Sequence, residues 1–184
     1  MIEALELYDT DRHRHLAHAY AVDRKVIALQ FGTWSLWKLG YADQAVRLEE
    51  ELNGHVRRLG HANSLAQAFT GGASVYMLRR EPDILLARVA EGIAIARVHG
   101  YPVWTDHSNF WIGWALAEKG FVAEGIGFLR KALSAYCEHG AGASLPKFLG
   151  LLADRLGELG EFEEALARIG EAVEHIERTE ERAS

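Results

Sequence analysis

Apolar residues recur along this chain at intervals of three and four positions, the spacing that places them on one face of an α-helix. The segment 41–59 carries this pattern at Ala45, Val46, Leu48, Leu52 and Val56. The segment 161–178 carries it again, with glutamates at positions in between. No segment alternates apolar and polar residues for long enough to predict a β-strand. The pattern therefore predicts an all-α protein.

Glycines divide the helical segments about every 20 residues. Gly40, Gly120 and Gly160 are separated by multiples of 40, and Arg80 occupies the remaining slot. Midway between these positions lie Gly60, Gly100 and Gly140. Glycine adopts the left-handed conformation that ends many helices without a steric penalty from Cβ. We therefore expect four helix hairpins, over about 22–59, 62–99, 102–139 and 144–179, after a short leading helix near 11–20.

Positions 40 residues apart also share the size of their side chains. One column is small throughout, with Thr33, Ala73, Gly113 and Ala153, and another is large and apolar, with Leu36, Tyr76, Leu116 and Leu156. Small residues allow two helices to approach closely, and large ones fill the groove beside them. Each hairpin is then expected to stack on the next, so that residues 1–184 form one helical-repeat domain, an α-solenoid.

The turn sequences resemble those of tetratricopeptide repeats. The segments 39–45 and 159–165 each contain a glycine that ends one helix, an aromatic residue near the start of the next, and a following alanine. A closer resemblance is to the C-terminal tetratricopeptide-like region of large bacterial proteins that join a class III adenylate/guanylate cyclase domain to an AAA-type signalling ATPase. The similar segments are 37–45, 78–82, 113–120, 124–130, 148–153 and 177–182, together with Tyr8, Asp9 and His13.

This resemblance covers about residues 5–182. It implies a right-handed solenoid of tetratricopeptide-like hairpins and a regulatory or partner-binding role in bacterial signalling. It implies none of the catalysis, because the cyclase and ATPase modules are absent from the sequence.

Composition narrows the classes of function. The chain has 184 residues, of which 49% are apolar, and its formal charge of −6 argues against a surface built to bind nucleic acid. Cys137 is the only cysteine, which excludes an internal disulfide and a cysteine-based zinc site. The sequence has neither a run of 18 apolar residues nor the pattern of a secretory signal. We therefore expect a cytoplasmic protein that does not bind membranes.

Candidate chemistry is sparse. No lysine follows a glycine, so the phosphate-binding loop of nucleotide-binding proteins is absent from the sequence. The cluster of His13, His15 and His18 places two imidazoles on one helical face without a carboxylate partner, so neither a metal nor another cofactor is expected. His61, His99 and His139 flank predicted turns, where a cation is favourable near the carboxyl end of a helix. We expect a protein that is not an enzyme.

The resemblance also implies which positions face a binding groove, since the first helix of each pair lines the concave face of a tetratricopeptide-like stack. These positions vary from repeat to repeat and mix aromatic with polar side chains, as expected of a surface that recognises a protein or peptide ligand. The predicted partner-binding residues are Gln30, Trp34, Gln67, Thr70, Ser74, His107, Phe110, Trp114, Lys147 and Asp154. The competing interpretation is that Trp34 and Trp114 merely fill the inner curve of the solenoid.

Two other functions stay open at this point. Catalysis in the groove would use His107 with Asp154 or Lys147 as acid–base partners, although no spacing in the sequence demands it. A purely structural oligomerisation module is the other alternative, because solenoids usually end in a polar cap. The last predicted helix instead carries the apolar residues Leu166, Ile169, Val173 and Ile176. We therefore expect further helices, another chain or a second copy to cover it, the last case being a homodimer through the C-terminal helix.

Overall fold

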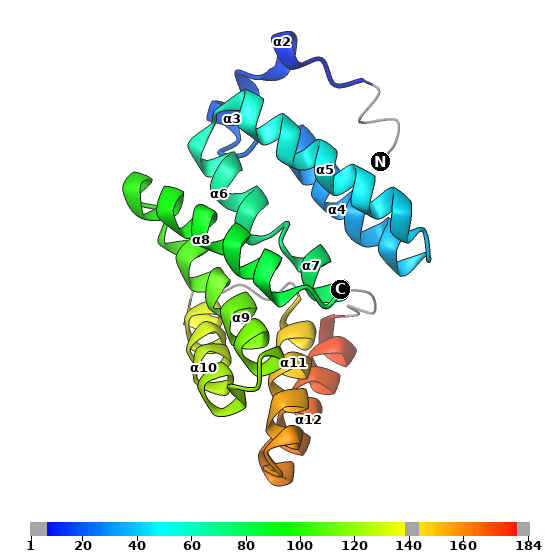
Figure 1. Ribbon diagram of the computed structural model, residues 1–184, viewed down its shortest axis with the longest axis vertical. Helices are drawn as coiled ribbons and strands as arrows, with labels where there is room; N and C mark the ends of the chain where they lie inside the picture. Colours follow the sequence, from blue (N-terminus) through cyan, green and yellow to red (C-terminus); the bar gives the residue numbers. More distant parts are fainter. Residues whose placement is uncertain (1–6, 139–143, 180–184) are drawn as a thin grey trace. The chain divides into compact units, whose positions relative to one another are not determined.

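The computed structural model describes residues 7–138 and 144–179 (Figure 1). Every regular element in these two ranges is an α-helix, so the expected all-α helical-repeat fold is confirmed. Among the described helices, none combines the length and the hydrophobicity that crossing a bilayer requires.

The helices follow the predicted order. They are α2 (Thr10–His13), α3 (Leu16–Ala19), α4 (Arg24–Lys38), α5 (Ala42–Leu59), α6 (Ala62–Thr70), α7 (Ser74–Leu78), α8 (Pro82–His99), α9 (Pro102–Glu118), α10 (Val122–Glu138), α11 (Leu145–Glu158) and α12 (Phe162–Thr179). Helix α4 packs along α5, α6 along α8, and α11 along α12, as hairpin partners do.

The chain divides into two compact units, Met1–Thr105 and Asp106–Ser184. The division falls within α9, so the first turn of that helix belongs to the first unit. That residues 1–184 form one continuous domain with a right-handed course stays a prediction.

Left-handed residues end the helices at the predicted positions. The backbone φ angle is positive at Gly40 (87°), Gly60 (66°), Gly100 (72°), Gly120 (90°) and Gly160 (80°). Arg80, which stands where the series Gly40, Gly120 and Gly160 lacks a glycine, takes the same conformation, with φ of 56°. Gly140 lies outside the described residues.

The prediction of a single leading helix near 11–20 is wrong. Two separate turns, α2 and α3, stand in its place. Asp9 Oδ1 accepts a hydrogen bond from Arg12 N–H at 3.0 Å and begins α2, whereas His18 N–H bonds only three residues back, to His15 O, at 3.2 Å. Segments this short have little helical stability of their own, so contacts with the rest of the fold decide their backbone conformation.

The first arm of the second hairpin, predicted as one helix, is divided into α6 and α7. Consecutive glycines at Gly71 and Gly72 each cost a helix about 1 kcal/mol relative to alanine. A Cβ built on Gly72 would lie 2.3 Å from Ala68 O and 3.2 Å from Leu52 Cδ2. The break therefore lets the chain pass close to its own preceding turn, where only glycine fits.

The small column of the repeats lies at close helix contacts. Thr33, Ala73 and Ala153 are buried. In the second unit α9 meets α10 at Gly113 and Gly125, where a Cβ on Gly113 would lie 2.7 Å from Gly125 O. The core cluster of the first unit consists of Val22, Val26, Leu29, Leu52, Val56, Ala68 and Phe69.

Candidate binding surfaces

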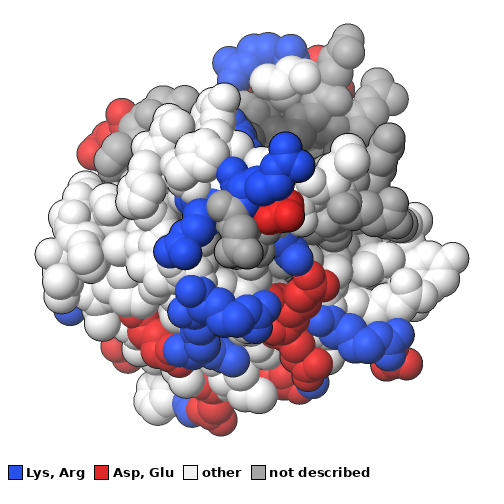
Figure 2. Space-filling model, turned by 90° about the horizontal axis from the view of Figure 1, so that it is seen from above, with Lys and Arg blue, Asp and Glu red and all other residues white. Residues whose placement is uncertain are grey.

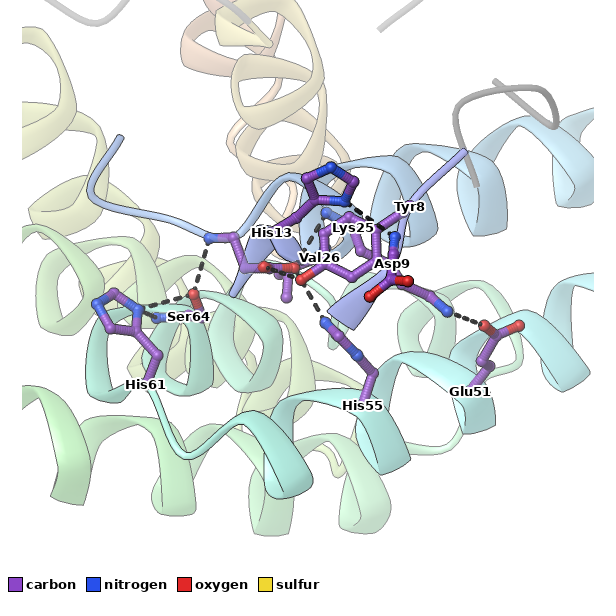
Figure 3. Close-up of polar contacts among 10 residues, drawn as sticks. Tyr8, Asp9, His13, Lys25, Val26, Glu51, His55, His61 and Ser64 are labelled. Atoms are coloured by element: carbon purple, nitrogen blue, oxygen red, sulfur yellow. Dashed lines mark hydrogen bonds and ion pairs between the residues drawn. The ribbon is translucent and has the colours of Figure 1, made fainter. Parts of the chain in front are cut away.

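Asp23 is the centre of a buried polar cluster in the first unit (Figure 3). It caps α4, because its Oδ1 accepts hydrogen bonds from Lys25 N–H at 3.0 Å and Val26 N–H at 3.2 Å. The same oxygen lies 3.0 Å from His55 Nε2, and Oδ2 accepts a hydrogen bond from the Tyr8 hydroxyl at 2.6 Å. Asp23 is 0% exposed and His55 2% exposed. The buried carboxylate is thus surrounded by donors.

These donors keep the carboxylate ionised. Burial by itself raises the pKa of Asp23, but the hydrogen bonds from His55 and Tyr8 outweigh it and hold the pKa below its usual value. Burial and the hydrogen bond to Asp23 raise the pKa of Tyr8, so its hydroxyl remains a donor. The cluster therefore ties the segment before α2 to the start of α4 and to the C-terminal part of α5.

A second arm of the cluster runs from Asp23 to the start of α6. Ser64 Oγ accepts a hydrogen bond from Asp23 N–H at 2.9 Å and lies 2.9 Å from His61 Nδ1. The same Nδ1 accepts from Ser64 N–H at 3.4 Å, so His61 caps α6. A ring nitrogen that accepts carries no proton. The proton of the neutral His61 ring therefore sits on Nε2, which points away from Ser64 (Figure 3).

This geometry corrects the expectation that His61 serves as a cation at the carboxyl end of a helix. Burial, and then the nearby His18, lower the pKa of His61, so the ring is neutral near pH 7. His99 does lie in the last turn of α8, as expected. His139 lies outside the described residues.

Serine, histidine and aspartate side chains lie together here, but they do not form a catalytic triad. In a triad one histidine bonds to both the serine and the aspartate. The Asp23 carboxylate bonds to His55, whereas the partner of Ser64 is His61. Ser64 is 0% exposed, and its Oγ already accepts the Asp23 N–H. These residues cap helices α4 and α6 and hold them together. Sequence reasoning missed it, although an aspartate just before a helical segment is a readable capping signal.

A cavity of about 410 Å³ lies beside His61 in the first unit. Its lining consists of Arg14, His18, Leu59, Gly60, His61, Ala62 and Tyr101. The rings of His18 and His61 meet edge to face, with centres 4.9 Å apart. In the view of Figure 2, lysine and arginine side chains gather near the middle, with aspartate and glutamate side chains among them. The last turn of α5 contributes Arg57 and Arg58 to the basic residues of this unit.

His107 has a different environment in the second unit. The centre of its ring lies 5.8 Å from that of Phe110, 5.6 Å from Trp111 and 5.4 Å from Phe148. Lys147 Nζ lies 4.9 Å from the centre of the Phe148 ring. Burial and the positive charge of Lys147 lower the pKa of His107 to about 3. The ring is therefore neutral at physiological pH and packs as an aromatic side chain.

The predicted partner-binding residues differ in exposure. The buried ones are Gln30, Thr70, Ser74, Phe110 and Trp114. The partly exposed ones are Trp34, Gln67, His107 and Lys147, and the exposed one is Asp154.

The structure brings some of these residues together within each unit. Gln67 Nε2 donates to Gln30 Oε1 at 3.2 Å, and the Thr70 hydroxyl donates to Ala66 O at 2.8 Å, so these polar groups are used inside the fold. Asp154 instead forms an ion pair with Arg155 at 2.8 Å. Whether any of the predicted residues contacts a partner stays a prediction.

Two exposed apolar features were missed or only partly seen in the sequence. Phe31 on α4 is 51% exposed, and its ring centre lies 5.0 Å from that of Trp34, edge to face. On α12 the exposed apolar residues are Phe162 (65%), Leu166 (68%), Ile169 (48%) and Val173 (47%). Their spacing of four, three and four residues places them on one face, which we call the α12 stripe. The same spacing could have added Phe31 to Trp34 and Phe162 to Leu166.

No protein-family model matches the chain. An uncharacterised protein of Rhizobium meliloti (strain 1021) is 28% identical to it over 176 residues, which are 95% of this chain. This chain spans only 17% of the length of that curated relative. Among solved structures, a chain named MamA MSR-1 C2 has 23% sequence identity and a TM-score of 0.47, over 95% of this chain and 84% of its own length.

Proposed function

We propose that this protein is a non-enzymatic interaction module that binds a peptide segment or a partner domain on the face of its first helices. The observation that carries the proposal is the aromatic pair of Phe31 and Trp34 on α4. Phe31 is 51% exposed, and the two rings meet edge to face 5.0 Å apart. Large rings fixed at a helix surface offer apolar area at a small entropic cost, which is how anchor residues concentrate binding energy at interfaces.

Catalysis in the groove finds less support. With a pKa of about 3, His107 is a weak base at physiological pH. The proposed acid partner Asp154 has a 63% exposed side chain and pairs with Arg155 at 2.8 Å. The positive charge of Lys147 further disfavours protonation of the His107 ring.

Site-specific photo-crosslinking tests the interaction surface. We expect a photo-reactive amino acid at Phe31 to capture a discrete partner in cells of the source organism, whereas the same group at exposed Asp43 on α5 captures none. The double variant Phe31→Ala, Trp34→Ala should lose the captured partner in co-purification while it keeps its helical circular dichroism. Equal crosslinking at both positions would reject this surface.

Trp114→Ala is not a suitable member of this test. Trp114 is only 4% exposed, so its truncation opens a cavity at a cost of about 3–5 kcal/mol, and a lost partner would then report lost folding.

We further propose that the partner belongs to a cytoplasmic bacterial signalling system that contains a cyclase or a signalling ATPase. The support is the resemblance of the segments 37–45 and 113–120 to the tetratricopeptide-like region of such proteins. Mass spectrometry of the crosslinked partner tests this part separately. A partner from an unrelated process would contradict the signalling context and leave the interaction surface intact.

The α12 stripe favours a second candidate function, an oligomerisation module. Four large apolar side chains, each at least 47% exposed, share one face of this helix. A second copy that docks on the stripe would remove this apolar area from water, which is the main driving force of association. Both candidate functions could coexist, because they use α4 and α12 respectively.

Analytical ultracentrifugation across micromolar concentrations tests the second candidate. We expect a dimer that Leu166→Lys converts to a monomer, while Ala167→Lys, at an exposed neighbouring position, leaves it dimeric. A wild-type chain that sediments as a monomer at every concentration would contradict self-association.

A further inference from the structure

We propose that the cavity beside His61 is a binding site for an oxoanion, a phosphate or carboxylate group. This inference does not depend on the proposed interaction surface on α4, because it rests on different residues. The cavity of about 410 Å³ is far larger than a single water-sized void, and its described lining includes one arginine and two histidines.

The described lining supplies hydrogen-bond donors of the kind that oxoanions need. Arg14 brings a guanidinium group, which is always charged and matches the geometry of phosphate and carboxylate oxygens. His18 and His61 bring two imidazole rings 4.9 Å apart. None of the described residues that line the cavity carries a carboxylate.

The buried cluster fixes His61 as one of these donors. Its Nδ1 is occupied by Ser64 N–H and the Ser64 hydroxyl, so the neutral ring can donate only from Nε2. Ser64 is held in turn by Asp23 N–H at 2.9 Å. His61 therefore needs no protonation to act as a donor, and its ring is oriented before any ligand arrives. Such preorganisation reduces the entropic cost of binding.

The acidic groups near the cavity are already engaged. The Asp23 carboxylate accepts hydrogen bonds from Tyr8 and His55. At the end of α5, Arg57 is paired with Glu91 at 2.7 Å, whereas Arg14 belongs to the segment between α2 and α3 and lines the cavity itself. A bound anion would thus pair with Arg14, and His61 would fix its orientation.

An NMR titration of the full chain with sodium phosphate, at constant ionic strength and pH 7, tests the site. We expect saturable shifts of the backbone amides of Gly60 and Ala62, which line the cavity. Arg14→Ala should weaken phosphate binding about tenfold, the effect of losing one charge-assisted hydrogen bond. His61→Asn should weaken it as well, while its amide oxygen keeps the cap of α6 and so preserves the fold.

Arg12→Ala is the matched control, because it removes a positive charge from the same segment without touching the described lining. It should bind phosphate like the wild type. Equal weakening in Arg12→Ala and Arg14→Ala would show general electrostatic attraction and overturn the proposal. Shifts that stay linear with phosphate concentration would overturn it too.

Capped tripeptides then distinguish a free ion from an anionic group on a partner. If a peptide with a central phosphoserine binds more tightly than inorganic phosphate and still requires Arg14, the site recognises a phosphorylated protein. If it binds more weakly, with the same dependence on Arg14, the site takes the free ion. Binding of the matching serine peptide to the same residues would overturn recognition of an oxoanion.

Discussion

The two compact units each pack a histidine edge-on against an aromatic ring, yet the outcome differs. In the first unit the ring of His55 lies 5.6 Å from that of Tyr8, and its Nε2 lies 3.0 Å from the Asp23 carboxylate. In the second unit the ring of His107 lies 5.4 Å from that of Phe148, and its charged neighbour is Lys147. His55 completes a polar network, whereas His107 packs against aromatic rings.

The difference shows that the neighbours of a histidine, and not its residue type, decide its chemistry. The buried carboxylate of Asp23 has four donors. Two are backbone N–H groups at the start of α4, and the other two, from Tyr8 and His55, join segments that are far apart in the sequence. The His107 ring lies among aromatic side chains and near a lysine, and this environment favours its neutral form. Hence the surroundings of His55 depend on a buried charge, and those of His107 on aromatic packing.

The largest effect is expected from Asp23→Ala in the first unit. The variant leaves His55, Tyr8 and two backbone N–H groups without their acceptor, which should lower the free energy of unfolding by about 3–5 kcal/mol. Urea denaturation followed by circular dichroism measures this loss. Asp43→Ala, at an exposed position of α5, should change stability by less than about 0.5 kcal/mol. Similar losses in both variants would contradict the importance of the cluster.

Close packing in the second unit is tested by Gly113→Ala. The added Cβ would lie 2.7 Å from the backbone oxygen of Gly125, so α9 and α10 must separate, at a cost of about 2–3 kcal/mol. Gly127→Ala is the matched control, since a Cβ there meets nothing within 4 Å. It should stabilise α10 by about 0.5–1 kcal/mol. Thermal unfolding of the pair measures both effects, and the predicted signs are opposite.

The dependence of stability on pH separates the two histidine environments. The pKa of His107 is about 3 in the folded chain and ordinarily about 6.5, so below pH 6.5 only the unfolded chain takes up this proton. Stability should therefore fall by about 1–2 kcal/mol between pH 7 and pH 5, with a smaller contribution from His61, whose pKa is also lowered. His107→Phe should remove most of this slope.

Asp23 acts in a separate pH window. Its pKa is lowered in the folded chain, so the stability that it contributes is present above the ordinary carboxyl pKa and is lost only as the pH falls below about 4. Asp23→Asn should therefore keep the slope between pH 7 and pH 5. Urea denaturation at each pH measures both variants, and an unchanged slope in His107→Phe would contradict the account of His107.

The smallest change in stability is expected at the left-handed turn position that is Arg80 in the first unit and Gly120 in the second. Arg80 in the first unit has a positive φ of 56°, and Gly120, 40 residues later, has one of 90°. Arg80→Gly should stabilise the chain by about 1 kcal/mol, and Gly120→Ala should destabilise it by about the same amount. Differential scanning calorimetry can resolve shifts of this size. A loss of stability in Arg80→Gly would show that contacts of the arginine side chain outweigh the backbone strain.

Local patterns predicted most of the helices correctly. The ends of α5, α8 and α9 coincide with Gly60, Gly100 and the residues before Gly120, because a left-handed glycine is a property of the chain at that point. The leading segment was predicted wrongly because it contacts residues further along the sequence: Tyr8 bonds to Asp23, and the His18 ring packs against that of His61. The break between α6 and α7 was missed because close approach to Leu52 favours glycine there.

The candidate sites were less accessible to sequence reasoning. The cluster around Asp23 joins residues 15, 32 and 41 positions away, and no local pattern relates them. The cavity beside His61 likewise draws on the segment after α2, the end of α5 and the turn before α9. In contrast, the apolar face of α12 could be predicted in large part, since all its members lie on a single helix.

The sequence by itself determined that this chain is helical, where its turns fall and which columns are small enough for close helix contacts. Those properties depend on backbone conformation and on periodicity within about 20 residues. Only the tertiary structure decided that Asp23 is buried among donors, that His107 is neutral among aromatic rings and that His61 lines a cavity with Arg14. The protonation and the orientation of these groups depend on neighbours that the folded chain brings from distant positions.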